Sequence, residues 1–157
     1  MPAAEYLAEK IWQPIGAEAD AAWLVDAKGS ELGYCCLNAV LRDYARLGLL
    51  LAHDGNWRGR QVIPAQWVLD ATTVRAGDDH LKPGVGGRYF GYGYQVWIFP
   101  GERRQFAFLG VRGQKIFVDP AARLVLVQTA VRPEYRDRPG DAEVHALFQA
   151  AVRQLGE

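Results

Sequence analysis

Residues 90–131 consist of short runs of aromatic and β-branched residues separated by glycine, proline and aspartate. The former residue types favour extended strands, and the latter favour the turns that end strands. The pattern predicts an antiparallel meander of about three main strands, with turns at Pro100-Gly101 and over residues 119–122. Residues 110–114 interrupt this run with two glycines. They indicate a bulge, a tight turn, or a place where a ligand or another backbone approaches closely.

Four other segments repeat apolar residues every three or four positions, and this periodicity predicts helices. These segments are residues 3–12, 38–53, 64–73 and the stretch that follows residue 141. Asn38 and Asp141 are predicted to cap the second and last helices, and Pro64 to open the third. The side chains expected to face the core are Tyr6, Leu7 and Ile11; Leu37, Val40, Leu41, Tyr44, Ala45, Gly48 and Leu51; Trp67, Val68 and Ala71; and Val144, Leu147, Phe148, Ala151, Val152 and Leu155.

A helix with one apolar stripe that follows a meander should lie across one face of the sheet. The predicted fold class is therefore α+β, an antiparallel sheet with flanking helices. The length of 157 residues indicates a single domain, residues 1–157. Half of the residues are apolar and 23% are charged, as in an ordinary globular domain.

The net charge is zero but unevenly distributed. Residues 1–80 contain 7 basic and 11 acidic residues, and residues 81–157 contain 11 and 7, so the balances are −4 and +4. Neither half is basic enough to predict nucleic-acid binding. No stretch is long enough to span a bilayer, so we expect no membrane partner. The first residues lack the basic and apolar regions of a signal peptide, which favours a cytoplasmic location.

Cys35 and Cys36 are adjacent, and a disulfide between neighbours strains the peptide that joins them, so we expect no bridge. The three histidines, His53, His80 and His145, lie far apart and lack the spacing of a helical metal pair. We therefore predict no metal site and no cofactor.

Five segments in order resemble the serine β-lactamase-like hydrolases. This family includes class C β-lactamases, esterases, D-alanyl-D-alanine peptidases and 6-aminohexanoate-dimer hydrolases. The segments are residues 6–16, 37–48, 57–68, 91–97 and 110–114. The last two, Gly-Tyr-Gly-Tyr-Gln-Val-Trp and Gly-Val-Arg-Gly-Gln, look most like the aminohexanoate-hydrolase branch. The resemblance covers nearly the whole chain and implies the C-terminal part of the transpeptidase fold.

The chemistry of that family needs a Ser-x-x-Lys helix, in which the lysine accepts the proton of the attacking serine. A tyrosine from a separate loop assists proton transfer. This chain contains one serine, Ser30, and no Ser-x-x-Lys. The neighbours of Tyr34 resemble a later Gly-Gly-Leu turn, so Tyr34 is not assigned as the catalytic tyrosine. The resemblance therefore implies the C-terminal portion of a hydrolase without its catalytic Ser, Lys and Tyr.

The resemblance places part of a pocket at residues 110–112. Val111 falls where the family's backbone N–H contributes to the oxyanion hole, and Gly110 where a glycine lets the substrate approach. Arg112 could bind a substrate carboxylate through a bidentate contact. A plain β-bulge explains Gly110 and Val111 equally well, and a solvated turn arginine is the favoured alternative for Arg112.

Three further residues are candidates for substrate binding through the same resemblance. Tyr34 and Cys36 fall on the turn that lines the family's cleft, although ordinary loop packing is somewhat favoured. Trp97 could form a wall of the acyl pocket, although a tryptophan at the end of a strand more often belongs to the core. We do not expect Cys36 to replace the nucleophile, because no neighbouring His or Lys would activate its thiol.

Three classes of function fit these observations. The chain could be a hydrolase fragment that is inactive alone, a subunit completed by a separate N-terminal chain, or a non-catalytic binding module that retains the pocket wall. The expected partners are a small-molecule amide or ester and either an N-terminal hydrolase half or a second copy of the chain. In the family the first strands pair beside the last one. Residues 123–131 should therefore have an unpaired edge or be covered by a second chain.

Overall fold

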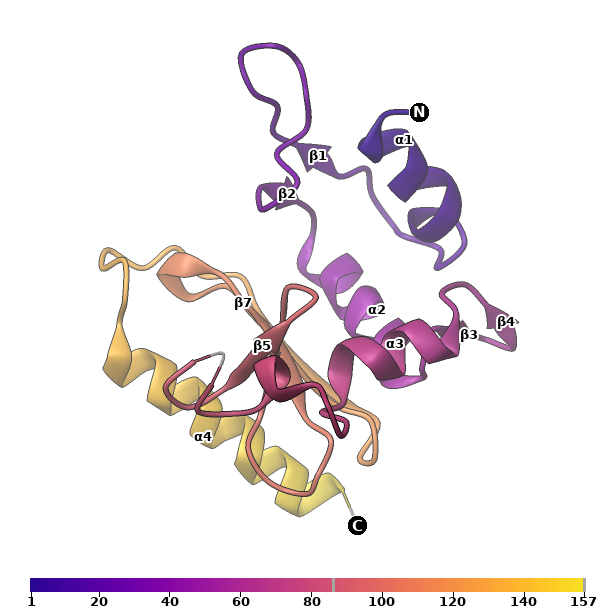
Figure 1. Cartoon of the computed structure of the whole chain (residues 1–157). Helices are drawn as coiled ribbons and strands as arrows, with labels where there is room; N and C mark the ends of the chain where they lie inside the picture. The colour runs from indigo at the N-terminus through magenta and orange to yellow at the C-terminus, as the bar shows by residue number, and fades with distance from the viewer. Residues whose placement is uncertain (86, 157) are drawn as a thin grey trace.

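The computed structural model describes residues 1–85 and 87–156. Figure 1 shows a central antiparallel sheet with helix α4 on one side and helices α2 and α3 on the other. The first half of the chain contains α1 (Ala3–Leu7), which continues into a π-helical turn η1 (Ala8–Trp12), β1 (Ala22–Trp23), β2 (Leu37–Asn38), α2 (Leu41–Ala52), β3 (Asn56–Trp57), β4 (Arg60–Gln61), α3 (Ala65–Thr72) and η2 (Asp79–Leu81). The second half contains β5 (Gly91–Gly93), β6 (Val96–Ile98), β7 (Phe106–Leu109), η3 (Val111–Gly113), β8 (Lys115–Asp119), β9 (Leu124–Gln128) and α4 (Arg138–Leu155).

The main sheet is a meander in the order β5-β6-β7-β8-β9, and each strand is antiparallel to its neighbour. This confirms the predicted topology and α+β class. The sheet has five strands because Tyr94 and Gln95 both adopt positive φ angles, 52° and 61°, and turn the chain between β5 and β6. Within the described residues β9 pairs with β8 alone, so its outer edge is unpaired as the family resemblance implied.

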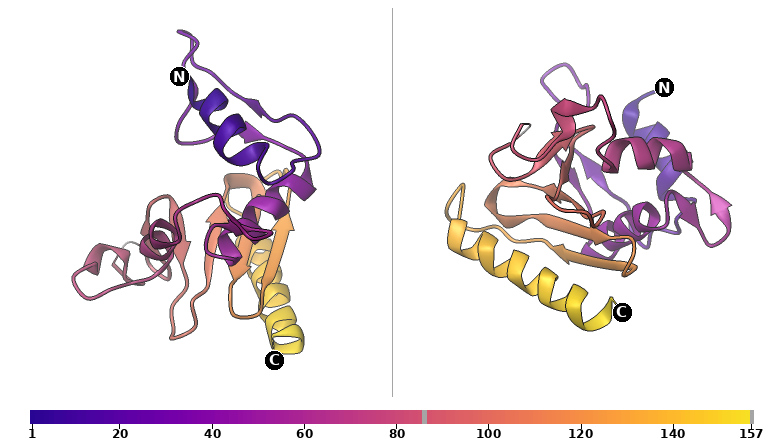
Figure 2. Two further views of the ribbon diagram at one scale, coloured as in Figure 1. Left: turned by 90° about the vertical axis from the view of Figure 1, so that its right-hand side faces the viewer. Right: turned by 60° about the horizontal axis from the view of Figure 1, so that its bottom comes forward.

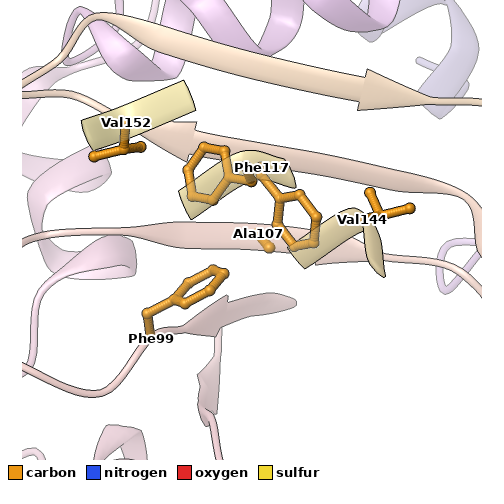
Figure 3. Packing of buried hydrophobic residues seen from close by; sticks show 6 residues of the cluster. Phe99, Ala107, Phe117, Val144 and Val152 are labelled. Atoms are coloured by element: carbon orange, nitrogen blue, oxygen red, sulfur yellow. The ribbon is translucent and has the colours of Figure 1, made fainter. Parts of the chain in front are cut away.

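Helix α4 covers one face of the sheet. Val144, Phe148 and Val152 are buried at intervals of four residues and meet Phe99 and Phe117 from the strands. The rings of Phe117 and Phe148 stack with centroids 5.1 Å apart. Figure 3 shows this cluster between the helix and the strands. Burial of each large apolar side chain contributes about 1.5–3 kcal/mol, so this interface holds the helix to the sheet.

Helix α2 packs on the opposite face and also against the N-terminal region. The views in Figure 2 show α4 and α2 on opposite sides of the strands. Gly48 contacts the sheet, whereas Leu50 is fully buried in a cluster with Trp12 and Ile15. The helix therefore buries two faces and not one stripe. No helix within residues 1–85 and 87–156 is both long enough and apolar enough to cross a lipid bilayer.

Several predicted core positions are exposed. They are Tyr6, Val40, Leu41, Trp67, Leu147 and Leu155, which retain between 40% and 67% of their accessible surface. Their helices contact neighbours along narrow lines, so apolar residues at the margins of each predicted stripe face outward. The predicted positions Val68, Ala71, Val144, Phe148 and Val152 are buried.

The predicted caps are wrong. Asn38 lies in β2, where its side-chain amide donates to the Cys36 carbonyl, and α2 begins only after Val40. Asp137 caps α4 by accepting a hydrogen bond from the Gly140 amide, so Asp141 already belongs to the first turn. Pro64 precedes α3 as its N-cap residue. Of these three helices only α4 has a side-chain cap, whereas α2 and α3 begin after Val40 and Pro64 without one.

Gly48 allows α2 to approach β9 closely. A Cβ built there would lie 2.5 Å from Cγ1 of Val125 and 3.1 Å from Cγ2 of Ile116, and both are stiff β-branched side chains. We expect Gly48→Ala to lower the free energy of unfolding by about 1–2 kcal/mol, because overpacking exceeds the gain of about 1 kcal/mol in helix propensity. Urea unfolding should measure this. Gly33→Ala, where a Cβ meets nothing within 4 Å, is the control. A more stable Gly48→Ala variant would contradict this contact.

His145 should make stability depend on pH. Its ring lies 5.1 Å from Phe99 and 6.2 Å from both Phe117 and Tyr89, and burial lowers the pKa of His145 below its ordinary value of 6.5. The unfolded state therefore binds more protons just below pH 6.5, and stability should fall as the pH falls through that window. Urea unfolding from pH 5 to 8 should show this decline, which His145→Gln should reduce and His53→Gln, at an exposed site, should leave unchanged. An equal decline in both variants would exclude His145 as its source.

Candidate functional site

The turn between β7 and β8 presents the Val111 amide. The Gly110 amide donates to the Gln114 carbonyl at 2.8 Å, which closes the turn. Val111 is the first residue of the one-turn helix η3, where a backbone N–H has no intrahelical acceptor. In the described part of the chain this N–H has no other hydrogen-bond partner. Val111 is also half exposed, so the turn lies at the surface of the protein.

Gly110 is required by the turn itself. A Cβ at this position would lie 2.7 Å from Oε1 and 3.0 Å from Cβ of Gln114. The Gln114 side chain occupies that space because its amide donates to the Ala130 carbonyl at 3.0 Å. The glycine is therefore explained by local packing, and close approach of a substrate remains a proposal.

Arg112 has a left-handed backbone, with φ 61° and ψ 20°. Its Nη1 donates to the Arg132 carbonyl at 3.0 Å and also to the Pro133 carbonyl. Its backbone amide and carbonyl bond to Tyr135 and Arg132. The partners of Arg112 are thus backbone groups of the neighbouring 132–135 segment. The sequence had instead predicted a substrate carboxylate or solvent as its partner.

An ion-pair cluster supports this segment from the start of α4. Arg132 lies 3.1 Å from Asp137 and 3.5 Å from Asp141, and its Nη2 donates to the Gly140 carbonyl at 3.2 Å. The ammonium of Lys115, which is 5% exposed, lies 2.7 Å from Asp141. These charged groups join β8, the 130–135 segment and α4.

The turn with Tyr34 and Cys36 belongs to a separate hairpin. The indole of Trp23 donates to the carbonyls of Leu32 and Cys35, at 3.1 and 2.9 Å, and fixes the turn. The structure joins Cys35 and Cys36 in a disulfide, so the expectation of no bridge was wrong. Cys36 adopts a φ of 79° in this turn.

Tyr34 is 75% exposed on that turn. Figure 1 shows the hairpin of β1 and β2 standing away from the sheet. In residues 1–85 and 87–156 no hydrogen bond or ion pair links the 32–36 turn to the 110–114 turn. The contacts therefore bring Gly110, Val111 and Arg112 together but do not join Tyr34 or Cys36 to them.

Trp97 lies opposite Tyr92 and Ala107 across neighbouring strands, on the face that α4 covers. Its ring contacts Tyr92 at 4.5 Å and Phe90 at 6.1 Å between centroids. It is half buried against the α4 cluster, as a core tryptophan would be. A role as a pocket wall remains a proposal.

Ser30 sits in an exposed turn that provides no base for it. The Asp26 carboxylate accepts hydrogen bonds from the backbone amides of Ser30 and Lys28, and these bonds lower the pKa of Asp26. The Tyr44 hydroxyl donates to the Leu37 carbonyl, and burial raises the pKa of Tyr44. Among the described residues no group of three or more His, Cys, Asp or Glu side chains could hold a metal ion.

Sequence reasoning missed the residues that support the Val111 turn. Gln114 and Gln128 bond to backbone carbonyls of neighbouring segments, with the Gln128 amide 2.7 Å from the Gly113 carbonyl. Lys115 and Asp141 are 26 residues apart in the printed sequence and meet only after α4 docks. No local pattern marks such residues, although a lysine opening a buried strand was a usable signal.

The chain is similar in sequence and in structure to proteins named as 6-aminohexanoate-dimer hydrolases or candidates for that activity. No protein-family model matches the chain. A curated relative, the 6-aminohexanoate-dimer hydrolase of Paenarthrobacter ureafaciens, is 25% identical over 132 residues, or 83% of this chain and 34% of the relative. The structure of a candidate 6-aminohexanoate-dimer hydrolase from Bacillus anthracis matches with a TM-score of 0.84 and 30% identity, over 98% of this chain and 39% of that protein. The chain thus spans about a third of the length of its curated relative.

Two further structures confirm the fold. A β-lactamase from Mycobacterium bovis matches with a TM-score of 0.68 and 22% identity, over 98% of this chain and 57% of that protein. A candidate β-lactamase from Bacteroides dorei matches with a TM-score of 0.58 and 16% identity, over 92% of this chain and 51% of that protein. The antiparallel sheet with flanking helices is therefore part of the β-lactamase-like fold.

Proposed function

We infer, from the relationship of this chain to the serine β-lactamase-like hydrolases over part of their length, that it forms the oxyanion side of a hydrolase cleft. The reaction we propose is hydrolysis of an amide or ester. It requires a Ser-x-x-Lys element and a proton-transfer tyrosine from polypeptide outside these 157 residues. The chain by itself is therefore proposed to be inactive.

The observation that carries this proposal is the unpaired Val111 amide. Attack of a serine on a carbonyl places negative charge on the carbonyl oxygen, and a fixed N–H donor stabilises that charge. Val111 is half exposed and its amide has no acceptor in the described residues, and both flanking residues are held by hydrogen bonds.

The absence of an activated nucleophile supports the need for completion. A hydroxyl is a weak nucleophile unless a neighbouring base takes its proton. Ser30 is the one serine in the sequence, and its backbone amide donates to the Asp26 carboxylate at 3.0 Å. That carboxylate already accepts two backbone hydrogen bonds and is a poor base, because these bonds lower the pKa of Asp26.

The edge of β9 is the proposed place of completion. β9 pairs with β8 on one side, and its other edge is unpaired in the part of the chain that the structure describes. An exposed strand edge offers a row of backbone donors and acceptors to an added strand. Residues 124–128 carry no charge or proline that would block pairing. We therefore propose that the missing hydrolase half adds its strands here.

The names of the relatives suggest a substrate class. Both are described as 6-aminohexanoate-dimer hydrolases, which cleave an amide between amino-acid units. We propose a linear amide of this kind as the first substrate to test, with simple esters as the second.

The isolated chain should not hydrolyse nitrocefin, p-nitrophenyl esters or the 6-aminohexanoate dimer. It should also remain unlabelled by a fluorophosphonate, because it contains no activated serine. Absorbance assays, chromatography of the dimer and intact-mass spectrometry check these expectations. Ser30→Ala is the control for non-specific labelling. Stoichiometric labelling that Ser30→Ala abolishes would overturn the proposal.

Loss of the Val111 amide should reduce turnover in a reconstituted enzyme. We expect a complex with a polypeptide that carries Ser-x-x-Lys and the tyrosine loop to hydrolyse the amide or an ester. Val111→Pro removes the N–H and should lower kcat roughly 10²- to 10³-fold, whereas Val111→Ala keeps it and should have little effect.

The melting profile of the Val111→Pro complex must match that of the parent complex, because proline can also distort the turn. A folded Val111→Pro complex with the parental kcat would show that the turn is structural and not an oxyanion donor.

A further inference from the structure

We propose that Arg112 is a positioning residue that clamps the Val111 turn in place and is not a ligand for a substrate carboxylate. The catalytic consequence rests on the proposed function, because it assumes that the Val111 amide stabilises an oxyanion. The clamp itself is a property of the chain alone and can be tested without activity.

Four hydrogen bonds join Arg112 to the 132–135 segment. Its amide donates to the Tyr135 carbonyl at 3.4 Å, and its carbonyl accepts from the Arg132 amide at 2.9 Å. Its Nη1 donates to the Arg132 carbonyl at 3.0 Å and to the Pro133 carbonyl. The residue next to the unpaired Val111 amide is thus fixed through its main chain and its side chain to one neighbouring segment.

The same contacts leave the Arg112 guanidinium fewer free N–H groups with which to bind a substrate carboxylate. A guanidinium binds a carboxylate strongly when two parallel N–H groups are available in one fork. The two carbonyls of Arg132 and Pro133 accept both hydrogens that Nη1 carries. The end fork formed by Nη1 and Nη2 is therefore occupied, and only the side fork formed by Nε and Nη2 is open to a carboxylate, a contact that the second experiment tests.

Arg112 has a left-handed backbone with a φ of 61°, which is uncommon for a residue with a Cβ. Arg123, in the turn between β8 and β9, has a similar φ of 50°. In the described residues its side chain makes no hydrogen bond or ion pair, and its amide makes one bond, to the Pro120 carbonyl. Arg123 is therefore a matched control at the opposite end of β8.

The segment that holds Arg112 is itself anchored. The Arg132 guanidinium is 17% exposed and pairs with Asp137, the N-cap residue of α4, and with Asp141 in its first turn. The position of the Val111 amide thus follows from α4 through Arg132 and Arg112. A backbone N–H stabilises an oxyanion only if its direction is fixed before the reaction. The contacts from α4 through Arg132 to Arg112 fix that direction.

The first experiment compares Arg112→Gly with Arg123→Gly in the isolated chain. Glycine accepts the left-handed backbone at both sites, so each substitution removes the side chain without adding strain. Hydrogen exchange of the Arg132 amide, which donates to the Arg112 carbonyl, should become about tenfold faster in Arg112→Gly and stay unchanged in Arg123→Gly. Parental exchange in Arg112→Gly would overturn the clamp.

Arg112→Lys keeps the charge but lacks the planar fork, and it covers the case in which Arg112→Gly fails to fold. We expect its Arg132 amide to exchange at a rate between those of the parent and Arg112→Gly. Parental exchange in a folded Arg112→Lys chain would also count against the clamp, because the planar guanidinium would then not be needed to hold the turn.

The second experiment separates positioning from carboxylate binding in a reconstituted complex. Arg112→Gly should lower kcat by a similar factor for p-nitrophenyl acetate and for the 6-aminohexanoate dimer, with little change in KM for either, and Arg112→Lys should restore part of the loss. A rise in KM confined to the dimer, which has a free carboxylate, would overturn the proposal. If no complex is active, the proposed function fails, while the exchange result still decides whether Arg112 clamps the turn.

Discussion

The antiparallel pairing of β7 with β8 is the constraint on which the rest of the structure depends. Phe106 lies opposite Val118, and Leu109 lies opposite Lys115, so the register leaves residues 110–114 as a closed turn. The same register directs Ala107 and Phe117 toward α4 and Phe106 and Val118 toward α2 and α3. A shift by one residue would exchange these faces and bury the wrong side chains. The position of the Val111 amide is therefore fixed by the packing of the core.

The two ends of β8 are stabilised by different charge arrangements. At its C-terminal end, Asp119 is fully buried and accepts hydrogen bonds from Arg103, Gln105 and the Ala122 amide. Burial alone raises the pKa of Asp119, but these hydrogen bonds outweigh it and the pKa is lowered. Lys115 at the N-terminal end pairs with Asp141 of α4. The first arrangement closes a hairpin locally, whereas the second ties the Val111 turn to a helix distant in sequence.

The sequence predicted those features that depend on nearby residues. Strand-forming runs and turn residues gave the meander, and helical periodicity gave the four helices. The cap at Asn38 was misplaced because α2 begins after Val40 with no side-chain cap, and the cap at Asp141 was misplaced because Asp137, four residues earlier, is equally suitable. The clamp of Arg112 on the 132–135 segment could not be predicted, because its acceptors are backbone carbonyls about twenty residues away that carry no residue-specific signal.

The proposed oxyanion donor is the backbone N–H of Val111, so the proposed site depends on the residues that orient this N–H. The N–H of residue 111 is chemically the same for every residue except proline, so the side chain of Val111 carries little of the proposed function. The direction of that N–H matters instead, and it is determined by Gly110, Arg112 and the segments that hold them. In the proposed function, preorganisation of the oxyanion donor and supply of the nucleophile are therefore separable, because the sheet and α4 hold the Val111 turn and the nucleophile would come from another polypeptide.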